Sequence, residues 1–265
     1  MIRNLPTERL FGLDFVTLAT IDDVAARLLD ASGDRVADWR CVVTPNVDHL
    51  VRYQRHPAEA ETAATSFVVL PDGMPIVLAS RLLGRPLTAR LPGSDLFGAL
   101  WPVLAAESVP VVAVAPNEAV AAELEATYPG ARSVIAPMFD VDDEPAVSAL
   151  LDEIEAAVGE HRARVLVIGV SMPKHHLIAS RLRQRWAGEY CDKPIVMLLG
   201  ASPELALGLT RRAPKWMQRA GLEWLHRLLL DPRRMAKRYL VDDVAFIPLV
   251  WREWRQRGRR PPQHR

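Results

Sequence analysis

Three short polar clusters each follow an apolar run that has the composition of a buried strand. They are Thr44-Pro45-Asn46, Pro71-Asp72-Gly73 and Ser171-Met172-Pro173-Lys174. In parallel α/β sheets, ligands bind in the crevice outside the carboxyl ends of the strands. We therefore treat these three clusters as candidate ligand-binding sites.

Asp72 is the candidate catalytic side chain. It follows an apolar run and precedes a helical pattern, so its carboxylate can point into the crevice and act as a general base toward an acceptor hydroxyl. The alternative is that Asp72 caps the following helix or shapes the Pro-Asp-Gly turn. The residues alone favour this structural alternative.

Two further groups of polar residues flank the same predicted edge. Thr44 and Asn46 can hydrogen-bond a sugar or a phosphate, or can cap the helix that follows them. Arg90, Gly93 and Asp95 occupy a predicted loop before an apolar helix. Arg90 can pair with a diphosphate there, or can simply be solvated.

Several other kinds of site are not indicated. There is no glycine-rich phosphate loop of the Walker or dinucleotide type. His175 and His176 are adjacent, so we expect them on different faces of a helix, which makes a shared metal site poor. Asp140, Asp142 and Asp143 form an acidic loop rather than an Asp-X-Asp clamp before the crevice, and we expect it to be solvated. We predict no metal and no cofactor.

The elements that must position these residues alternate along the first 200 residues. The pattern predicts strands over 39–43, 66–70, 109–115, 134–136, 164–169 and 194–200, and helices over 47–54, 74–83, 118–127, 144–158 and 175–185. Continuous apolar strands that alternate with helices indicate a mostly parallel α/β sheet covered on both faces. We predict a Rossmann-like core over 1–209.

Charge divides the chain. From Arg211 onward there are 15 Lys/Arg against five acids, a net charge of +10, while residues 1–210 carry −9. Such a split indicates an anionic partner for the tail, either a membrane surface or nucleic acid. Four of the seven tryptophans also lie in the tail, which favours membrane. Two lone cysteines, Cys41 and Cys191, and no secretory signal at the start suggest a reducing cytosol.

The tail has the pattern of amphipathic helices. Apolar positions from Met217 to Leu229 recur at helical spacing, and the longest apolar stretch, Val244–Trp251, has only eight residues. About 20 are needed to cross a bilayer, so we predict an appendage over 210–256 that lies in the membrane interface. An ordinary helical subdomain packed on the core is an equally weighted alternative. Residues 257–265 are expected to be disordered.

Several of these segments resemble the WecG/TagA/CpsF glycosyltransferases. The stretches that carry the resemblance are Thr44-Pro-Asn46, LPDGMPIVLASRLLG at 70–84, RLPGSDL at 90–96, RAP at 212–214, KWMQRAGLEWLHRLL at 215–229 and DPRRMAKRYL at 231–240. They cover about Val42 to Leu240 in family order, and the long tail motif is the most specific.

The resemblance implies a metal-independent, inverting transfer of an N-acetylmannosamine-type or related hexose from UDP to a lipid-diphosphate-linked acceptor in cell-surface polysaccharide assembly. It implies Asp72 as the base, with Thr44, Asn46 and Arg90 contacting substrate. We expect the remaining substrate-binding residues to be Gly93, Asp95, Lys174 and His175, and the membrane or diphosphate contacts to be Arg211, Arg212, Lys215, Arg219, Arg233, Arg234 and Arg238. The expected location is the inner face of the cytoplasmic membrane. A nucleic-acid partner is not expected, and a homo-oligomer is compatible with the sequence.

The chain departs from the family pattern at three places near the predicted crevice. A Gly-Gly pair is replaced by Ala115-Pro116, Pro-Lys-Gln-Glu becomes Pro-Lys-His-His at 173–176, and Gly-Gly-X-X-Asp-Phe becomes Gly-Ala-Ser-Pro-Glu-Leu at 200–205. These changes leave two alternatives open. One is a catalytically altered member that binds nucleotide sugar or scaffolds an assembly complex, and the other is a transferase with a non-wall acceptor.

Overall fold

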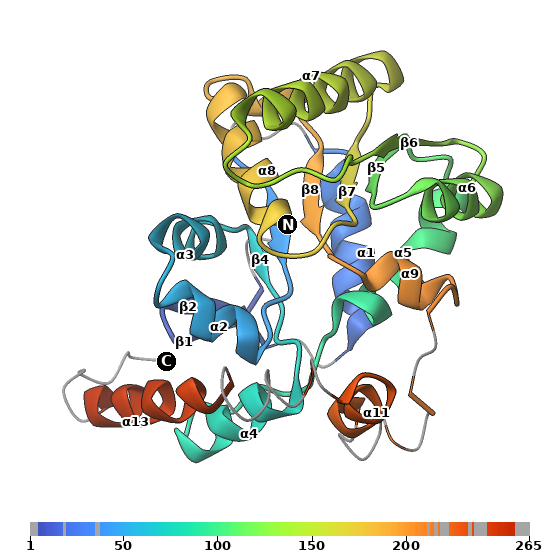
Figure 1. Ribbon diagram of the computed structural model, residues 1–265. Coiled ribbons are helices and arrows are strands. Elements are labelled where there is room, and N and C mark those ends of the chain that lie inside the picture. The colour runs from blue at the N-terminus through green and yellow to red at the C-terminus, as the bar shows by residue number, and fades with distance from the viewer. Residues whose placement is uncertain are drawn as a thin grey trace.

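The computed structural model describes residues 5–17, 20–34, 38–210, 213–214, 217, 223–232, 235 and 243–257. A single eight-stranded sheet runs through it, with helices on both sides (Figure 1). The strands are β1 (Thr7–Leu10), β2 (Leu13–Val16), β3 (Cys41–Val43), β4 (Val68–Val69), β5 (Val111–Ala115), β6 (Ala131–Ile135), β7 (Val165–Ile168) and β8 (Ile195–Leu198).

The strand order is β1-β2-β4-β3-β8-β7-β5-β6, and every pairing is parallel except the β1–β2 hairpin. The sheet therefore consists of two halves, each contiguous in sequence. Strands β1 to β4 form one half and β5 to β8 form the other. The halves join where Cys41–Val43 pairs with Val196–Leu198.

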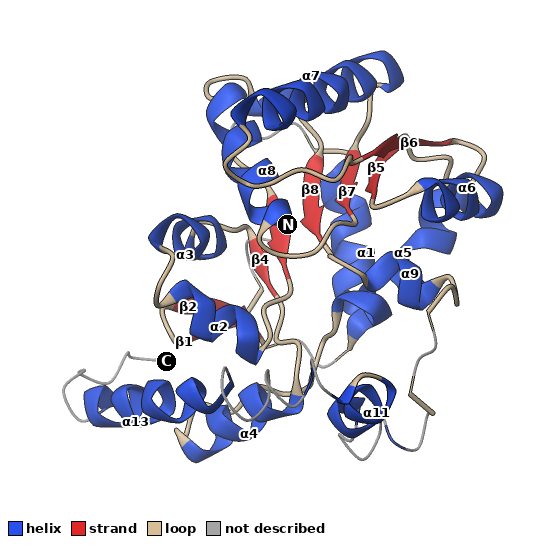
Figure 2. Cartoon of the chain, in the orientation of Figure 1, coloured by secondary structure: helices blue, strands red, loops and turns tan. Residues whose placement is uncertain are grey.

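Helices cover both faces of the sheet (Figure 2). The sheet therefore divides the apolar core into two layers, one on each face. Because successive strand residues point to opposite faces, Cys41 and Val43 belong to one layer and Val42 to the other. The helices are α1 (Ile21–Ser32), α2 (Val47–Tyr53), α3 (Pro57–Ala64), α4 (Met74–Leu82), α5 (Gly93–Ala106), α6 (Glu118–Thr127), α7 (Glu144–His161), α8 (Lys174–Arg185), α9 (Ser202–Ala206), α11 (Glu223–Leu230) and α13 (Phe246–Arg257).

The predicted mostly parallel α/β core is confirmed, and each predicted strand and helix of the first 200 residues has a counterpart. The β1–β2 hairpin, α1 and α3 were not predicted. Asn117 and Asp143 cap α6 and α7 by accepting from the N–H of Val120 and Ala146, respectively, so these helices begin where the polar residues stand.

The last helix, α13, is packed on the core along one side. Phe246 and Leu249 are buried in the same layer as α2, and the rings of Phe246 and Phe11 lie 5.3 Å apart. The other side of α13 is exposed, including Trp251 and Trp254. The two alternatives for this part of the tail are therefore not exclusive, because the helix has both a core-packed and an exposed side.

Candidate active site

The loops that leave β3 and β8 meet where the two halves of the sheet join. In open α/β sheets, such a boundary between strands is where ligand crevices form. Thr44 follows β3, Ser202 opens α9 after β8, and Gly93 opens α5. A Cβ atom placed on Gly93 would lie 2.7 Å from Ser202 Oγ and 3.0 Å from Thr44 Oγ1. The start of α5 is therefore held against both strand ends.

The turn that carries Asp72 is tied to the loops on either side of it. The Asp72 N–H donates to the Pro45 carbonyl at 3.1 Å, and the Leu91 N–H donates to the Pro71 carbonyl at 2.8 Å. The Asp72 turn thus lies between the loop of Thr44 and Asn46 and the loop of Arg90. Of the predicted site segments, those of Thr44 and Asn46, of Asp72 and of Arg90 are therefore brought together.

Asp72 lies one residue before the N-cap position of the following helix. The N-cap position of α4 is Gly73, with no side-chain capping bond, and its φ of 134° is in the region that glycine tolerates best. Asp72 itself is half-buried on the turn. Asp72 thus lies on the Pro-Asp-Gly turn, as the structural alternative has it, and this position is also compatible with the predicted role as base.

Three other predicted site residues at this edge lie at the N-termini of helices. The Asn46 side chain caps α2 by accepting from the His49 N–H at 3.2 Å. Gly93 and Asp95 do not lie in a loop but in the first turn of α5, because that helix begins directly after Pro92. Arg90 and Asp95 are half-buried beside this helix start.

His175 and His176 do not lie on unrelated faces of α8, as their adjacency suggested. Both are buried, with ring centroids 4.6 Å apart, and the His49 ring lies 5.8 Å from that of His175. Tyr53 of α2 also packs on the first turn of α8, with its ring centroid 5.4 Å from that of His176. The Tyr53 hydroxyl lies 2.9 Å from His176 Nε2.

The hydrogen bond between His175 and the Val170 carbonyl fixes the tautomer of the His175 ring. Its Nδ1 lies 2.9 Å from the Val170 carbonyl, which can only accept, so Nδ1 carries the proton and Nε2 is an acceptor. Nε2 is buried and has no hydrogen-bond partner among the described residues. Burial lowers the pKa of His175 to about 4, so the ring is neutral at pH 7.

Lys174 is the first residue of α8, in the segment that follows β7. Its Nζ lies 4.3 Å from the centre of the Phe139 ring, in the segment between β6 and α7. This cation–π contact directs the ammonium group toward that segment.

The described residues contain no group of three or more His, Cys, Asp or Glu side chains placed to hold a metal ion. In the acidic loop, Asp143 caps α7, while Asp140 is exposed. The predicted membrane or diphosphate contacts, Arg211, Arg212, Lys215, Arg219, Arg233, Arg234 and Arg238, lie outside the described residues.

Ser202 and His49 were not predicted as site residues. Ser202 lies within a segment that departs from the family pattern, at 200–205, and His49 is one of seven histidines with no local motif. Their positions depend on which strands are neighbours in the sheet. Only the spacing to Thr44 and to His175 in three dimensions identifies them.

Comparison with known proteins agrees with this geometry. The sequence model of the glycosyl transferase WecG/TagA/CpsF family matches residues 8–260. Two relatives are N-acetylglucosaminyldiphosphoundecaprenol N-acetyl-beta-D-mannosaminyltransferases. That of Bacillus spizizenii (strain ATCC 23059 / NRRL B-14472 / W23) is 27% identical over 73% of this chain and 72% of its own length, and that of Bacillus subtilis (strain 168) is 25% identical over 71% of each chain. The family match covers nearly the whole chain, including the segments of Thr44, Asp72 and Arg90 and most of the basic tail, and the chain belongs to the WecG/TagA/CpsF family of glycosyl transferases.

Proposed function

We propose that this chain is an inverting hexosyltransferase that moves an N-acetylmannosamine-type sugar from UDP to a lipid-diphosphate-linked acceptor. The observation that carries the proposal is the set of loops at the carboxyl ends of the neighbouring strands β3 and β4, where the segments of Thr44, Asp72 and Arg90 are joined by backbone hydrogen bonds. The names of the two Bacillus relatives supply the substrate class.

In the proposed reaction, Asp72 takes the proton of the acceptor hydroxyl as its oxygen attacks the anomeric carbon. The new glycosidic bond forms while the bond between the anomeric carbon and the phosphate oxygen breaks, and UDP leaves with that electron pair. Attack from the side opposite the leaving group inverts the anomeric configuration. Arg90 stabilises the charge that develops on the diphosphate, and Thr44 and Asn46 orient the sugar.

We further propose that the protein acts on the inner face of the cytoplasmic membrane. No helix among the described residues combines the length and the apolar character needed to cross a bilayer. Leu229 and Leu230 of α11 and Trp251 and Trp254 of α13 are exposed. Together with the net charge of +10 from Arg211 onward, these side chains support attachment to an anionic lipid surface.

Donor binding is tested first with a thermal-shift screen of nucleotide sugars. A ligand at about 100 times its dissociation constant adds about 2.7 kcal/mol to stability, which is easily measured. We expect a UDP-linked N-acetylhexosamine to raise the unfolding temperature most. If no UDP sugar does so, the proposed donor class is wrong.

The base is tested by Asp72→Asn, which preserves the shape of the turn. We expect turnover to fall by roughly 10² to 10⁴, with the donor-induced shift in unfolding temperature unchanged. The control is Asp140→Asn, which removes an exposed carboxylate and should leave turnover as in the wild type. Near-normal turnover in Asp72→Asn would remove that residue from the role. Donor binding without any transfer by the wild type would favour the catalytically altered alternative.

A further inference from the structure

Two helices far apart in the sequence expose apolar stripes at one end of the molecule. On α4 the stripe is Leu78 and Leu82, which are 55% and 71% exposed. On α13 it is Ile247, Trp251 and Trp254, which are 67%, 53% and 56% exposed. Spacings of three and four residues place each set on one side of its helix. We call these five residues the apolar face.

Both stripes point away from the same core layer. Ile76 and Ala79 of α4 and Phe246 and Leu249 of α13 are buried in one cluster, so the exposed residues of each helix lie on its outer side. The two helices lie together in Figure 1, at the end where α11 also lies. Arg85, three residues after α4, lies 3.9 Å from the Glu253 carboxylate of α13 and links them.

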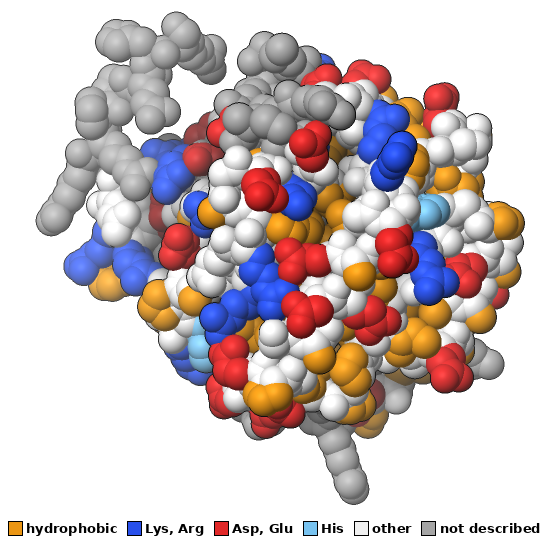
Figure 3. Space-filling view, turned by 90° about the horizontal axis from the view of Figure 1, so that it is seen from above, with side chains coloured by type: hydrophobic (Ala, Val, Ile, Leu, Met, Phe, Trp, Pro, Cys, Tyr) orange, Lys and Arg blue, Asp and Glu red, His pale blue; other side chains and the backbone are white. Residues whose placement is uncertain are grey.

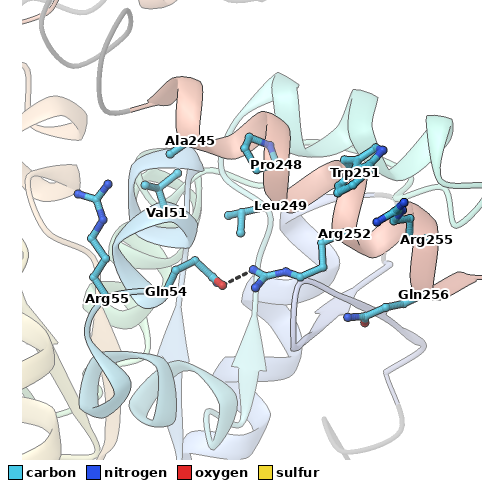
Figure 4. Close-up of a pocket in the computed structure, with 10 residues that line it drawn as sticks. All are labelled: Val51, Gln54, Arg55, Ala245, Pro248, Leu249, Trp251, Arg252, Arg255 and Gln256. Carbon is cyan, nitrogen blue, oxygen red and sulfur yellow. Dashed lines mark hydrogen bonds between the residues drawn. The ribbon is translucent and has the colours of Figure 1, made fainter.

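A basic groove borders the apolar face, between α2 and α13 (Figure 4). It has a volume of about 820 Å³. Arg55, Arg252 and Arg255 lie along it, and no acid is among the described residues that line it. The Arg255 guanidinium lies 3.9 Å from the centre of the Trp251 ring, so apolar and cationic groups are in direct contact here.

The opposite end of the molecule is different. Figure 3 looks down on that end, where α7 lies, and shows acidic and basic side chains mixed over the surface. Arg185 there lies 2.6 Å from both Asp152 and Glu155. Charges paired in this way give no net attraction for an anionic surface, whereas the arginines of the groove have no acid beside them in its lining.

We propose that α4 of the catalytic core, and not only the C-terminal tail, docks on the membrane together with α13. The apolar face enters the interface of an anionic bilayer, and the arginines of the groove contact lipid phosphates. Tryptophan suits this position because its ring is apolar and its N–H remains near water. Single exposed apolar residues are ordinary on protein surfaces, but five on two helices of one core layer are typical of an interaction site, and here they border a groove whose described lining holds three arginines and no acid.

Docking of α4 would also hold the proposed base, Asp72, near the lipid surface. This part of the inference rests on the proposed function. Helix α4 starts at Met74, directly after Asp72 and Gly73. A nine-residue helix is about 14 Å long at 1.5 Å per residue, so docking α4 on the bilayer holds Asp72 within about that distance of the lipid surface. An acceptor that is anchored by its lipid would then reach the base without leaving the membrane.

The test uses the full-length protein and vesicles that contain 30% phosphatidylglycerol, in roughly the proportion of an anionic inner leaflet. The variant is Leu78→Glu with Leu82→Glu. The matched control, which adds the same two charges, is Val103→Glu with Met138→Glu, and Met138 is 94% exposed. Val103 is an exposed apolar residue of α5, which covers the other core layer. We expect the double variant to lower the vesicle partition coefficient about tenfold or more, because two leucines lose burial and two negative charges approach the lipid. The control should bind as the wild type does.

Three measurements separate the possible outcomes. Thermal unfolding checks that both variants remain folded, as expected for exposed positions. Transfer to a short-chain, water-soluble acceptor should be unchanged in the double variant, while transfer to an acceptor in vesicles should fall with binding. Unchanged vesicle binding would overturn the docking of α4 without affecting the proposed transferase. Loss of transfer to both acceptors would show that α4 acts on the active site itself and would also overturn the proposal.

Discussion

Two hydroxyl groups crowd the position that a methyl group would take at Gly93. Its absent Cβ would lie 2.7 Å from Ser202 Oγ, 3.0 Å from Thr44 Oγ1 and 3.5 Å from Leu199 Cδ2. Gly98, five residues along the same helix, has no atom within 4 Å of the corresponding position. The two glycines therefore allow the same substitution to be made in one helix, with crowding in one case and none in the other.

The expected effects have opposite signs. Alanine is favoured over glycine inside a helix by roughly 1 kcal/mol, so Gly98→Ala should stabilise the protein by up to that amount. For Gly93→Ala the gain in helix propensity is smaller, because Gly93 lies in the first turn of α5. In addition, the new methyl group must displace the hydroxyls of Ser202 and Thr44. Overpacking of this kind costs roughly 1–3 kcal/mol. We expect a net loss of about 1–2 kcal/mol.

We expect Gly93→Ala to lower the transfer rate more than it lowers the stability of the fold. Relief of the contact requires Thr44 and Ser202 to rotate, or the start of α5 to move away from the strand ends. A displacement near 1 Å at a positioning residue can cost about 10² in rate. Urea unfolding and initial transfer rates of both variants check the two parts of this prediction. If Gly93→Ala matches Gly98→Ala in both stability and rate, the described packing at the β3–β8 junction is wrong.

Three other predictions address the histidines, the metal and the tail. His175 is neutral in the fold with a pKa of about 4 against 6.5 when unfolded, so the stability it contributes is present above pH 6.5 and is lost as the pH falls toward 4. Up to roughly 3 kcal/mol is involved, and urea midpoints from pH 7 to 5 should fall less in His175→Gln than in the wild type. Transfer should survive EDTA, and loss that is restored by magnesium or manganese would give the loop at Asp140 a metal role. Truncation after Thr210 should release the protein from anionic vesicles and abolish transfer, and high salt should weaken binding of the intact chain only partly; equal vesicle binding by the truncated form would make the tail structural.

The fold could be predicted where burial leaves a clear pattern. The strand residues Val111–Ala115 are buried on both faces and form a continuous apolar run, which is easy to recognise. The segment Thr7–Leu10 has only one buried residue and lies at the edge of the sheet, so its composition resembles a loop. Strand β1 was missed for that reason.

The site was predictable only in part. Thr44, Asp72 and Arg90 could be proposed because each follows or precedes a recognisable element, and the structure brings their loops together. That Ser202 lies beside Gly93 depends on β8 being the neighbour of β3, which no local pattern encodes. The contact of Lys174 with Phe139 likewise joins residues from two different loops.

The join between the two halves of the sheet also constrains the order in which the protein can fold. Strand β3 is complete at Val43, but the partner on its inner side is β8, whose Ile195–Leu198 is made only after more than 150 further residues. The Arg40 guanidinium donates to the carbonyl of Lys193 at 2.8 Å, and these two residues are 153 positions apart in the sequence. During synthesis, the apolar edge of β3 therefore stays uncovered while β4 to β7 are added. The two halves can join only once β8 has been made, and the packing of Phe246 and Leu249 of α13 on the core comes later still.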